Sequence, residues 1–116
     1  MLPTVFISHG SPMLAIEPGP YGNAWRKMAN DLPRPKAMLV VSAHWNTRQP
    51  SLTLADKPDT IHDFGGFPQE LFDVQYNAPG NPELAKQTAA LVHSTHVELD
   101  HDWGLDHGTW TVVRHM

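Results

Sequence analysis

The sequence predicts an α/β fold with a mostly parallel central sheet flanked by helices. Two apolar runs, residues 4–9 (TVFISH) and 37–45 (AMLVVSAHW), carry a serine and a histidine at or near their ends. Continuous apolar runs of this length are typical of strands that are buried on both faces. A segment of helical period lies between them, and its apolar repeat is Tyr21, Trp25, Met28 and Leu32. A strand, a helix and a strand in this order predict two parallel strands.

The rest of the chain predicts further strands and helices in alternation. Residues 51–55 and 96–100 alternate between apolar and polar side chains, which indicates two more strands. Residues 81–83 (NPE) are a helix start, because Asn caps a helix and Pro fits its first turn. That helix is expected to run to about residue 94. A short helix over residues 68–76 and a helix from Thr109 complete the prediction.

Composition limits the function classes. A length of 116 residues with 41% hydrophobic content predicts one domain. Eight Lys and Arg stand against 12 Asp and Glu, and the net charge of -4 argues against a nucleic-acid partner. The sequence has no Cys, so a metal would need nitrogen or oxygen ligands. Neither a signal peptide nor an 18-residue apolar run is visible, and we therefore expect a cytoplasmic protein without a membrane partner.

Two of the eight histidines stand at equivalent places. His9 and His44 each follow an apolar run and a serine. Because the carboxyl ends of parallel strands meet at one edge of a sheet, we expect these two side chains to lie close together. Ligands of open α/β sheets bind at that edge. The pair is therefore a candidate metal or catalytic site.

Two further histidines have an aspartate as their neighbour in sequence. Asp63 follows His62 and Asp106 precedes His107, and a neighbouring carboxylate can fix the tautomer of a histidine. For His62 and His107 the sequence leaves two roles open: lining a cleft at the candidate site, or a structural role. The other four are expected in solvated segments, outside the site: His93, His96, His101 and His115.

The loop over residues 57–68 is unusual, because it holds two Phe beside two Gly. One interpretation is a segment that folds over a cleft. The other is a loop that packs its aromatic side chains onto the core. The sequence leaves both open.

Four motifs together resemble the class III extradiol ring-cleavage dioxygenases of the DOPA 4,5-dioxygenase type. They are residues 8–13 (SHGSPM), 40–45 (VVSAHW), 61–68 (IHDFGGFP) and 104–110 (GLDHGTW). The resemblance implies an α/β fold and a non-haem Fe(II) centre, with Zn(II) as a frequent occupant in its place. It also implies cleavage of a catechol-type aromatic ring, such as that of DOPA, by O2.

The resemblance also implies roles for individual residues. His9 and His44 correspond to metal ligands, and His107 corresponds to an active-site histidine that positions substrate or moves protons. The loop motif is the predicted substrate-binding segment, through His62, Phe64 and Gly65.

Members of that family continue well beyond the last residue of this sequence. The resemblance therefore implies that residues 1–116 are the amino-terminal part of an extradiol dioxygenase α/β domain, without a further metal ligand and a second catalytic histidine. Low activity is expected of such a piece. Two alternatives stay open: a zinc hydrolase that uses the same histidines to activate water, and a non-catalytic metal-binding or inert truncated domain.

A truncated α/β domain would expose sheet edges and apolar helix faces, here including the surface around Val112 and Val113. Exposed edges and apolar patches favour association. The sequence therefore predicts a dimer or higher oligomer, in which His107 or His115 of a neighbour could complete the metal shell.

Overall fold

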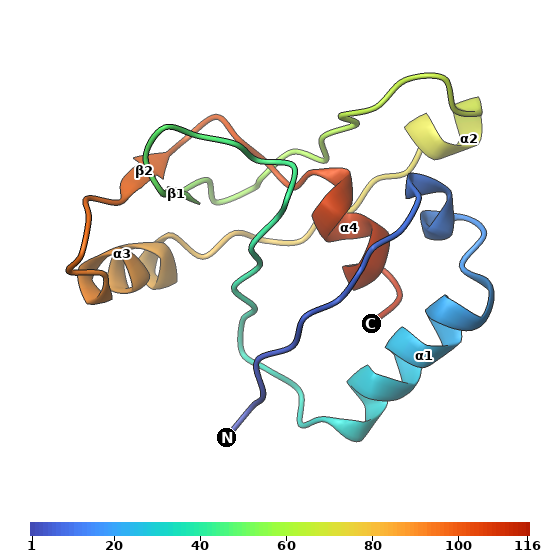
Figure 1. Ribbon diagram of the computed structural model, residues 1–116, viewed down its shortest axis with the longest axis horizontal. Coiled ribbons are helices and arrows are strands. Elements are labelled where there is room, and N and C mark those ends of the chain that lie inside the picture. The colour runs from blue at the N-terminus through green and yellow to red at the C-terminus, as the bar shows by residue number, and fades with distance from the viewer.

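A computed structural model describes all residues, 1–116, and confirms the α/β class with its parallel sheet. The structure contains a small sheet, four α-helices and one short 3-10 helix, η1. Figure 1 shows how the sheet and the α-helices are arranged. The elements in chain order are η1 (Pro12–Ala15), α1 (Gly19–Asp31), β1 (Ser51–Thr53), α2 (Gln69–Phe72), α3 (Pro82–Leu91), β2 (Glu98–Asp100) and α4 (His107–Val113).

The sheet consists of β1 and β2, which pair in parallel with Leu52 opposite Leu99. The pairing continues beyond the strands, since Thr60 and Leu105 form an isolated parallel bridge. α3 packs against both strands and lies beside them in Figure 1. The sheet thus carries the chain from β2 through Leu105 directly into α4, which bears one of the candidate site residues.

The core lies where η1, α2 and α4 meet. Its fully or nearly fully buried members are Ala15, Leu71, Val74 and Trp110. The indole of Trp110 also donates a hydrogen bond to the carbonyl oxygen of Ile61 at 2.9 Å. That bond attaches the loop of residues 61–68 to α4, as expected for a buried Trp whose N–H needs a partner.

The two apolar runs that predicted central strands are not strands, and this part of the prediction was wrong. Residues 4–9 and 37–45 form no backbone hydrogen bonds with other segments. Phe6 is 100% exposed and Val41 is 93% exposed. A strand that is buried on both faces needs a hydrogen-bonded neighbour and two covering layers, and this chain supplies neither to these segments.

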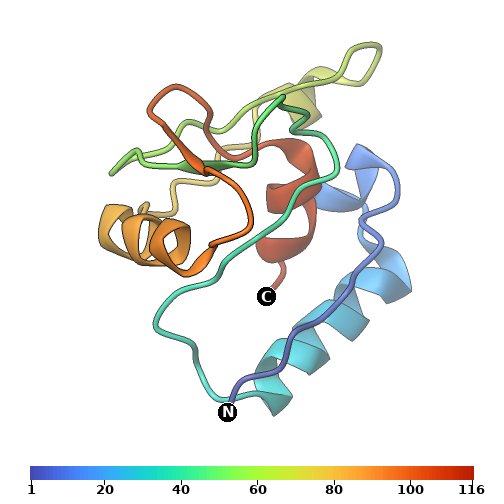
Figure 2. The ribbon, with the colours of Figure 1, turned by 60° about the vertical axis from the view of Figure 1, so that its left-hand side comes forward.

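The direction of the two segments nevertheless follows the predicted crossover. Figures 1 and 2 show residues 4–9 and 37–45 running the same way, from the carboxyl end of α1 toward α4. α1 joins the two segments, as its apolar period predicted, and its helical hydrogen bonding ends before Pro33. The ends of both segments therefore come together beside the first turn of α4.

The helix ends differ from the prediction by a few residues. α3 begins at the predicted cap, Asn81, whose side chain accepts a hydrogen bond from the Leu84 backbone N–H, but it ends at Leu91 rather than near residue 94. α4 begins two residues before Thr109, because Asp106 caps it.

The apolar surface that the sequence predicted around α4 is in a different place. Val112 is only 5% exposed, because α4 packs on η1 within this chain. Half of the large exposed apolar side chains lie on the two unpaired segments instead. No helix of the structure has both the length and the apolar character needed to span a lipid bilayer.

Candidate metal centre

His107 is the fixed member of the candidate site. It is the first residue of α4, where the side chain of Asp106 accepts a hydrogen bond from the backbone N–H of Thr109 at 3.3 Å. Aspartate is a preferred residue at this capping position. His107 is only 5% exposed, so its ring is held in place by the core and by the helix start.

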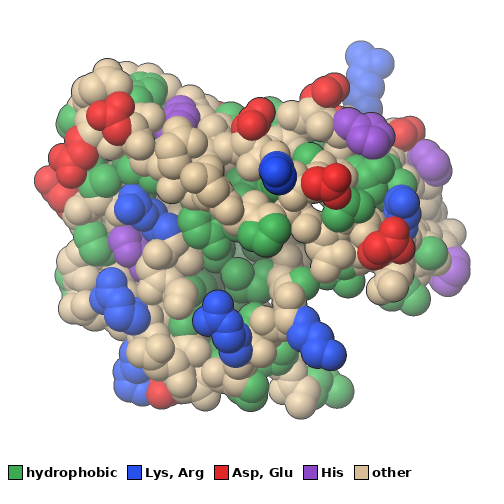
Figure 3. All heavy atoms as spheres, turned by 180° about the vertical axis from the view of Figure 1, so that it is seen from behind, with side chains coloured by type: hydrophobic (Ala, Val, Ile, Leu, Met, Phe, Trp, Pro, Cys, Tyr) green, Lys and Arg blue, Asp and Glu red, His purple; other side chains and the backbone are tan.

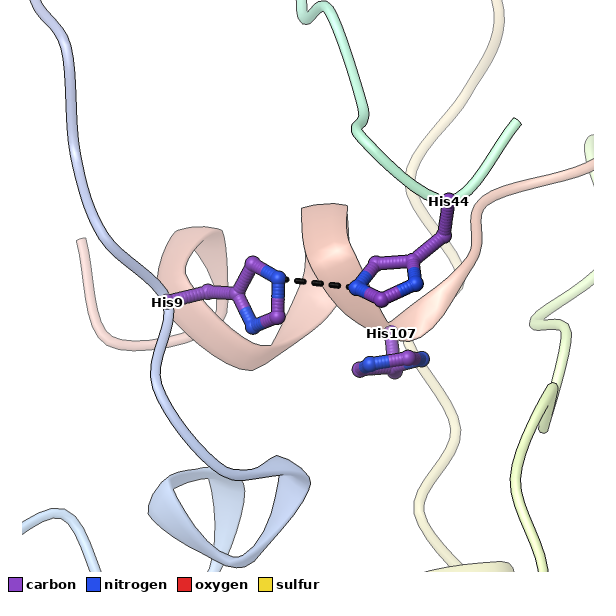
Figure 4. Close-up of side chains that lie close together, drawn as sticks. All are labelled: His9, His44 and His107. Carbon is purple, nitrogen blue, oxygen red and sulfur yellow. Dashed lines mark hydrogen bonds between the residues drawn. The ribbon is translucent and has the colours of Figure 1, made fainter. Parts of the chain in front are cut away.

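His9 and His44 approach His107 from the ends of the two unpaired segments. Their Nε2 atoms are 2.9 Å apart, so one of the two rings can donate a hydrogen bond to the other. The ring centroid of His107 lies 4.0 Å from that of His44 and 5.3 Å from that of His9. Figure 4 shows the three side chains pointing toward one another in front of α4. The predicted meeting of His9 and His44 is confirmed.

The three rings can serve as metal ligands, since one ring nitrogen from each lies within 4.8 Å of the other two. Two ligands of a tetrahedral zinc stand roughly 3.3 Å apart, from Zn–N distances of about 2.0–2.1 Å. The Nε2 separation of His9 and His44 is 2.9 Å, so a small opening suffices. The Nδ1 of His9 is buried without a hydrogen-bond partner, whereas its Nε2 faces His44 and is the nitrogen of this ring that a shared ion could use. Imidazole nitrogens suit both zinc and iron.

The aspartates contact other residues than their sequence neighbours. The Oδ1 of Asp63 accepts a hydrogen bond from the backbone N–H of His107 at 2.9 Å and also lies 2.9 Å from its Nδ1. The ring contact is short but bent away from a straight hydrogen bond. Burial by itself would raise the pKa of the Asp63 carboxyl, but the backbone and ring contacts with His107 outweigh it and lower the pKa.

Asp106 supports His44 through a serine. The hydroxyl of Ser42 donates to Asp106 Oδ1 at 2.6 Å, and the same hydroxyl accepts from the backbone N–H of His44 at 3.2 Å. The indole of Trp45, the residue after His44, stacks in parallel on that of Trp103 with centroids 5.7 Å apart. The exposed segment that carries His44 is therefore held at two points by the part of the chain around α4.

Gly108 allows α4 to approach His44 closely. A Cβ at this position would lie 2.7 Å from Ser42 Oγ and 2.9 Å from His44 Cδ2, which is closer than the ordinary contact distance of about 3.5–4.0 Å. Gly10, beside His9, has a φ of 63°, a conformation that glycine adopts without strain. Both histidines of the unpaired segments thus depend on a nearby glycine.

The loop residues predicted to bind substrate lie at different distances from the cluster. The ring of Phe64 packs edge-on against His107, with centroids 5.6 Å apart, and Gly65 next to it is exposed. The Nε2 of His62 hydrogen-bonds the carbonyl oxygen of Val74 at 2.7 Å, an interaction with the core side of the loop. The interpretation of a loop that packs its aromatic side chains on the core is confirmed, because Phe64 and Phe67 both pack against the core cluster. The interpretation of a segment that folds over a cleft stays a prediction.

The remaining histidines lie outside the cluster, and three of them are exposed: His93, His96 and His101. His115 is half-buried, stacks on Trp25 and hydrogen-bonds the carbonyl oxygen of Leu14 at 2.9 Å. His115 makes its contacts within this chain, and His107 does so within the histidine cluster. These contacts argue against either side chain binding the metal of a neighbouring copy.

Sequence reasoning missed three supporting contacts: that of Asp63 with His107, that of Ser42 with Asp106, and the close approach of Gly108 to His44. The serine had a signal, because a serine precedes both His9 and His44 by one or two residues. The contact between Asp63 and His107 had none, since the two are 44 residues apart and meet only through the packing of the loop on α4.

These features define a class: an α/β protein with a candidate three-histidine metal centre beside the first turn of a helix. Residues 3–116 match the family described as the catalytic LigB subunit of aromatic ring-opening dioxygenase, and the chain belongs to this family. The resemblance seen in the four motifs is thereby confirmed.

Individual relatives agree with the family. The chain is 49% identical over 116 residues to the 4,5-DOPA dioxygenase extradiol of Escherichia coli (strain K12), and this alignment covers 99% of the chain. It is 46% identical over 120 residues to the protein of the same name from Beta vulgaris, covering 97% of this chain. The alignments cover 43% and 44% of those two proteins, so the chain spans less than half the length of the curated relatives it matches.

Proposed function

We propose that the chain is the amino-terminal part of a metal-dependent extradiol dioxygenase that cleaves a catechol-type aromatic ring, such as that of DOPA, with O2. The observation that carries the proposal is the cluster of His9, His44 and His107 in a chain of the ring-opening dioxygenase family. Two relatives that bear the name of DOPA dioxygenase support the substrate class.

In this proposal His9 and His44 hold Fe(II) or Zn(II) through their Nε2 atoms, which already lie 2.9 Å apart. When bound, the metal supplies Lewis acidity toward the substrate oxygens, and iron supplies the redox chemistry with O2. Two histidines bind a metal weakly, and the third ring of the cluster lies close enough to assist. We expect activity below that of a longer enzyme, because the family's further ligand and base have no counterpart in residues 1–116.

His107 is the proposed catalytic residue for proton movement or substrate positioning. Its ring is buried and fixed at the start of α4, so it meets the substrate without losing rotamer freedom. Phe64 packs against that ring and offers an apolar wall to an aromatic substrate, with the exposed Gly65 beside it. His62, which is engaged with Val74, stays a predicted substrate-binding residue through its place in the loop.

Ring cleavage tests the proposal directly. The 116-residue chain, loaded with Fe(II) in air, is incubated with DOPA while O2 uptake and the absorbance of the ring-opened product are followed. We expect slow turnover that the double variant His9→Ala plus His44→Ala abolishes. A matched control, His93→Ala plus His101→Ala, removes two exposed histidines and should retain the wild-type rate. Ester or amide hydrolysis without O2 uptake would favour the zinc hydrolase instead.

Metal binding separates the enzyme from the inert alternative. Calorimetric titration with Zn²⁺ should give heat with the wild-type chain and with the exposed-histidine control, and little heat with the His9 and His44 double variant. Absence of heat from the wild-type chain would leave the inert truncated domain. Binding without any ring cleavage, in a chain of proven fold, would leave the non-catalytic metal-binding domain.

We also propose that the 116-residue chain self-associates through its two unpaired segments. The exposed side chains there include Phe6 and Val41, and apolar patches and unpaired backbone favour a second copy as partner. Figure 3 shows hydrophobic side chains at the base of a hollow on one face of the molecule.

Light scattering at micromolar concentration tests the association, and a wild-type monomer would contradict it. The variant Phe6→Lys plus Val41→Lys should be monomeric. Addition of a chelator should leave the oligomer intact, because His107 and His115 both make their contacts within this chain.

A further inference from the structure

The carboxylate of Asp63 is the anionic group that faces the ring of the buried His107. Its Oδ1 accepts a hydrogen bond from the His107 backbone N–H at 2.9 Å. The same oxygen lies 2.9 Å from His107 Nδ1, at an angle too bent for a hydrogen bond, so this ring contact is an electrostatic one. The side chains of His107 and Asp63 are 6% and 18% exposed, so water competes little with the contact. The Oδ1 of Asp106, the sequence neighbour, accepts from Ser42 and from the backbone N–H of Thr109. Its Oδ2 is buried without a hydrogen-bond partner, and the carboxylate within ion-pair distance of the His107 ring is that of Asp63.

The chemistry of the pair determines which nitrogen carries the proton. An ionised carboxylate only accepts hydrogen bonds, so it favours an N–H on the ring nitrogen that it faces. A neutral imidazole has one N–H, and a proton on Nδ1 therefore leaves a lone pair on Nε2. With Nδ1 facing Asp63, Nε2 is the nitrogen of His107 that remains for a metal ion or for a proton of the substrate.

We propose that Asp63 is a positioning residue that holds His107 in the Nδ1–H tautomer and so presents the lone pair of an unprotonated Nε2 either to the metal or to a phenolic hydroxyl of the substrate. The inference rests on the proposed function for the identity of that substrate. Its structural part, the tautomer of His107, does not depend on any activity.

The same carboxylate links the loop to the helix. Because Asp63 Oδ1 also binds the backbone N–H of His107, it ties residues 61–68 to the first turn of α4. Phe64, the next residue, packs against the ring of His107. Asp63 therefore sets the orientation of the ring and the position of the adjoining apolar wall together, which a distant carboxylate could not do.

The tautomer is read by long-range ¹H–¹⁵N spectra of the chain labelled at histidine, recorded without metal or substrate at pH 8. The signals of His107 are assigned by their loss in His107→Gln. We expect a protonated Nδ1 and an unprotonated Nε2 in the wild type. A wild type with the proton on Nε2 would overturn the proposal even if every variant failed to fold.

Variants separate positioning from simple loss of structure. Asp63→Ala removes the acceptor and should convert His107 to a mixed or Nε2–H state, with Zn²⁺ affinity about 10–100-fold lower, as for other supporting contacts of metal ligands. Asp63→Asn retains an oxygen that can accept both N–H groups, so it should keep the wild-type tautomer and recover most of the affinity. Asp102→Ala removes an exposed carboxylate and should change neither.

The outcomes distinguish this inference from the proposed function. An Nδ1–H tautomer that Asp63→Ala abolishes supports the inference even in a chain that cleaves no catechol. A chain that cleaves catechol while Asp63→Ala keeps both the tautomer and the Zn²⁺ affinity of the wild type refutes the inference and leaves the function standing.

Discussion

Replacing Gly108 by alanine should weaken metal binding more than it weakens the fold. The new Cβ would lie 2.9 Å from His44 Cδ2 and 2.7 Å from Ser42 Oγ, against an ordinary contact of about 3.5–4.0 Å. The segment of His44 must therefore retreat by roughly 0.6–1.3 Å to restore that contact distance, which exceeds the tolerance of about 0.5 Å for a working site. The exposed segment can move, since no backbone hydrogen bonds hold it.

The expected magnitudes follow from that displacement. We expect the Zn²⁺ affinity of Gly108→Ala to fall about 10–100-fold, the range seen when a contact that orients a metal ligand is lost. Stability should change little, because alanine favours the helix over glycine by up to about 1 kcal/mol and this offsets part of the strain. Competition titration with a zinc indicator and thermal unfolding measure the two quantities.

Gly65→Ala is the matched control for this experiment. A Cβ at Gly65 would meet no atom within 4 Å, so the same chemical change should leave the Zn²⁺ affinity as it is. Wild-type affinity in Gly108→Ala would refute the close packing of His44 on α4. An equal loss in both variants would point to an effect of the extra methyl group unrelated to position.

Three further outcomes are expected. Ser42→Ala removes the donor to the buried Asp106, and the poorly satisfied carboxylate should lower the free energy of unfolding by about 1–3 kcal/mol, measured by urea denaturation; an unchanged midpoint contradicts the contact. Gly80→Ala would place a Cβ 1.8 Å from the backbone oxygen of Ala55 and should cost at least about 2 kcal/mol in the same assay. Burial raises the pKa of Tyr76, so the folded state holds the phenolic proton more tightly than the unfolded chain does. The resulting contribution to the free energy of unfolding is complete below about pH 10 and is lost as the pH rises through the folded-state pKa. In Tyr76→Phe this alkaline loss of stability should be smaller, and an identical pH profile would contradict the burial.

The convergence of His9 and His44 could be predicted from sequence because it depends on chain direction alone. A helix between two extended segments brings their ends to the same side, and this holds whether or not the segments pair with neighbours. The strands themselves could not be predicted safely. The apolar runs of residues 4–9 and 37–45 are typical of central strands, but a strand exists only where another backbone accepts its hydrogen bonds, and the sequence of the run does not contain that neighbour.

The supporting contacts were harder to predict, because they join residues far apart in sequence. Adjacency suggested that Asp106 would orient His107, and the structure assigns that contact to Asp63 instead. The reason lies in the helix start: the carboxylate of a capping residue turns toward the N–H groups of its own first turn. Asp106 caps α4, so its Oδ1 faces the first turn of the helix, and the ring of the next residue pairs with Asp63.

The site therefore combines one rigid ligand with two adaptable ones. His107 is buried in the first turn of α4, whereas the segments of His9 and His44 form no backbone hydrogen bonds with other segments. Ordering a free backbone costs about 1–2 kcal/mol per residue, so any partner that covers and orders these segments would strengthen metal binding without touching the metal. The supports from Ser42 and Gly108 act in the same direction, since they reduce the freedom of the segment that carries His44 and leave less to be ordered when the ion binds.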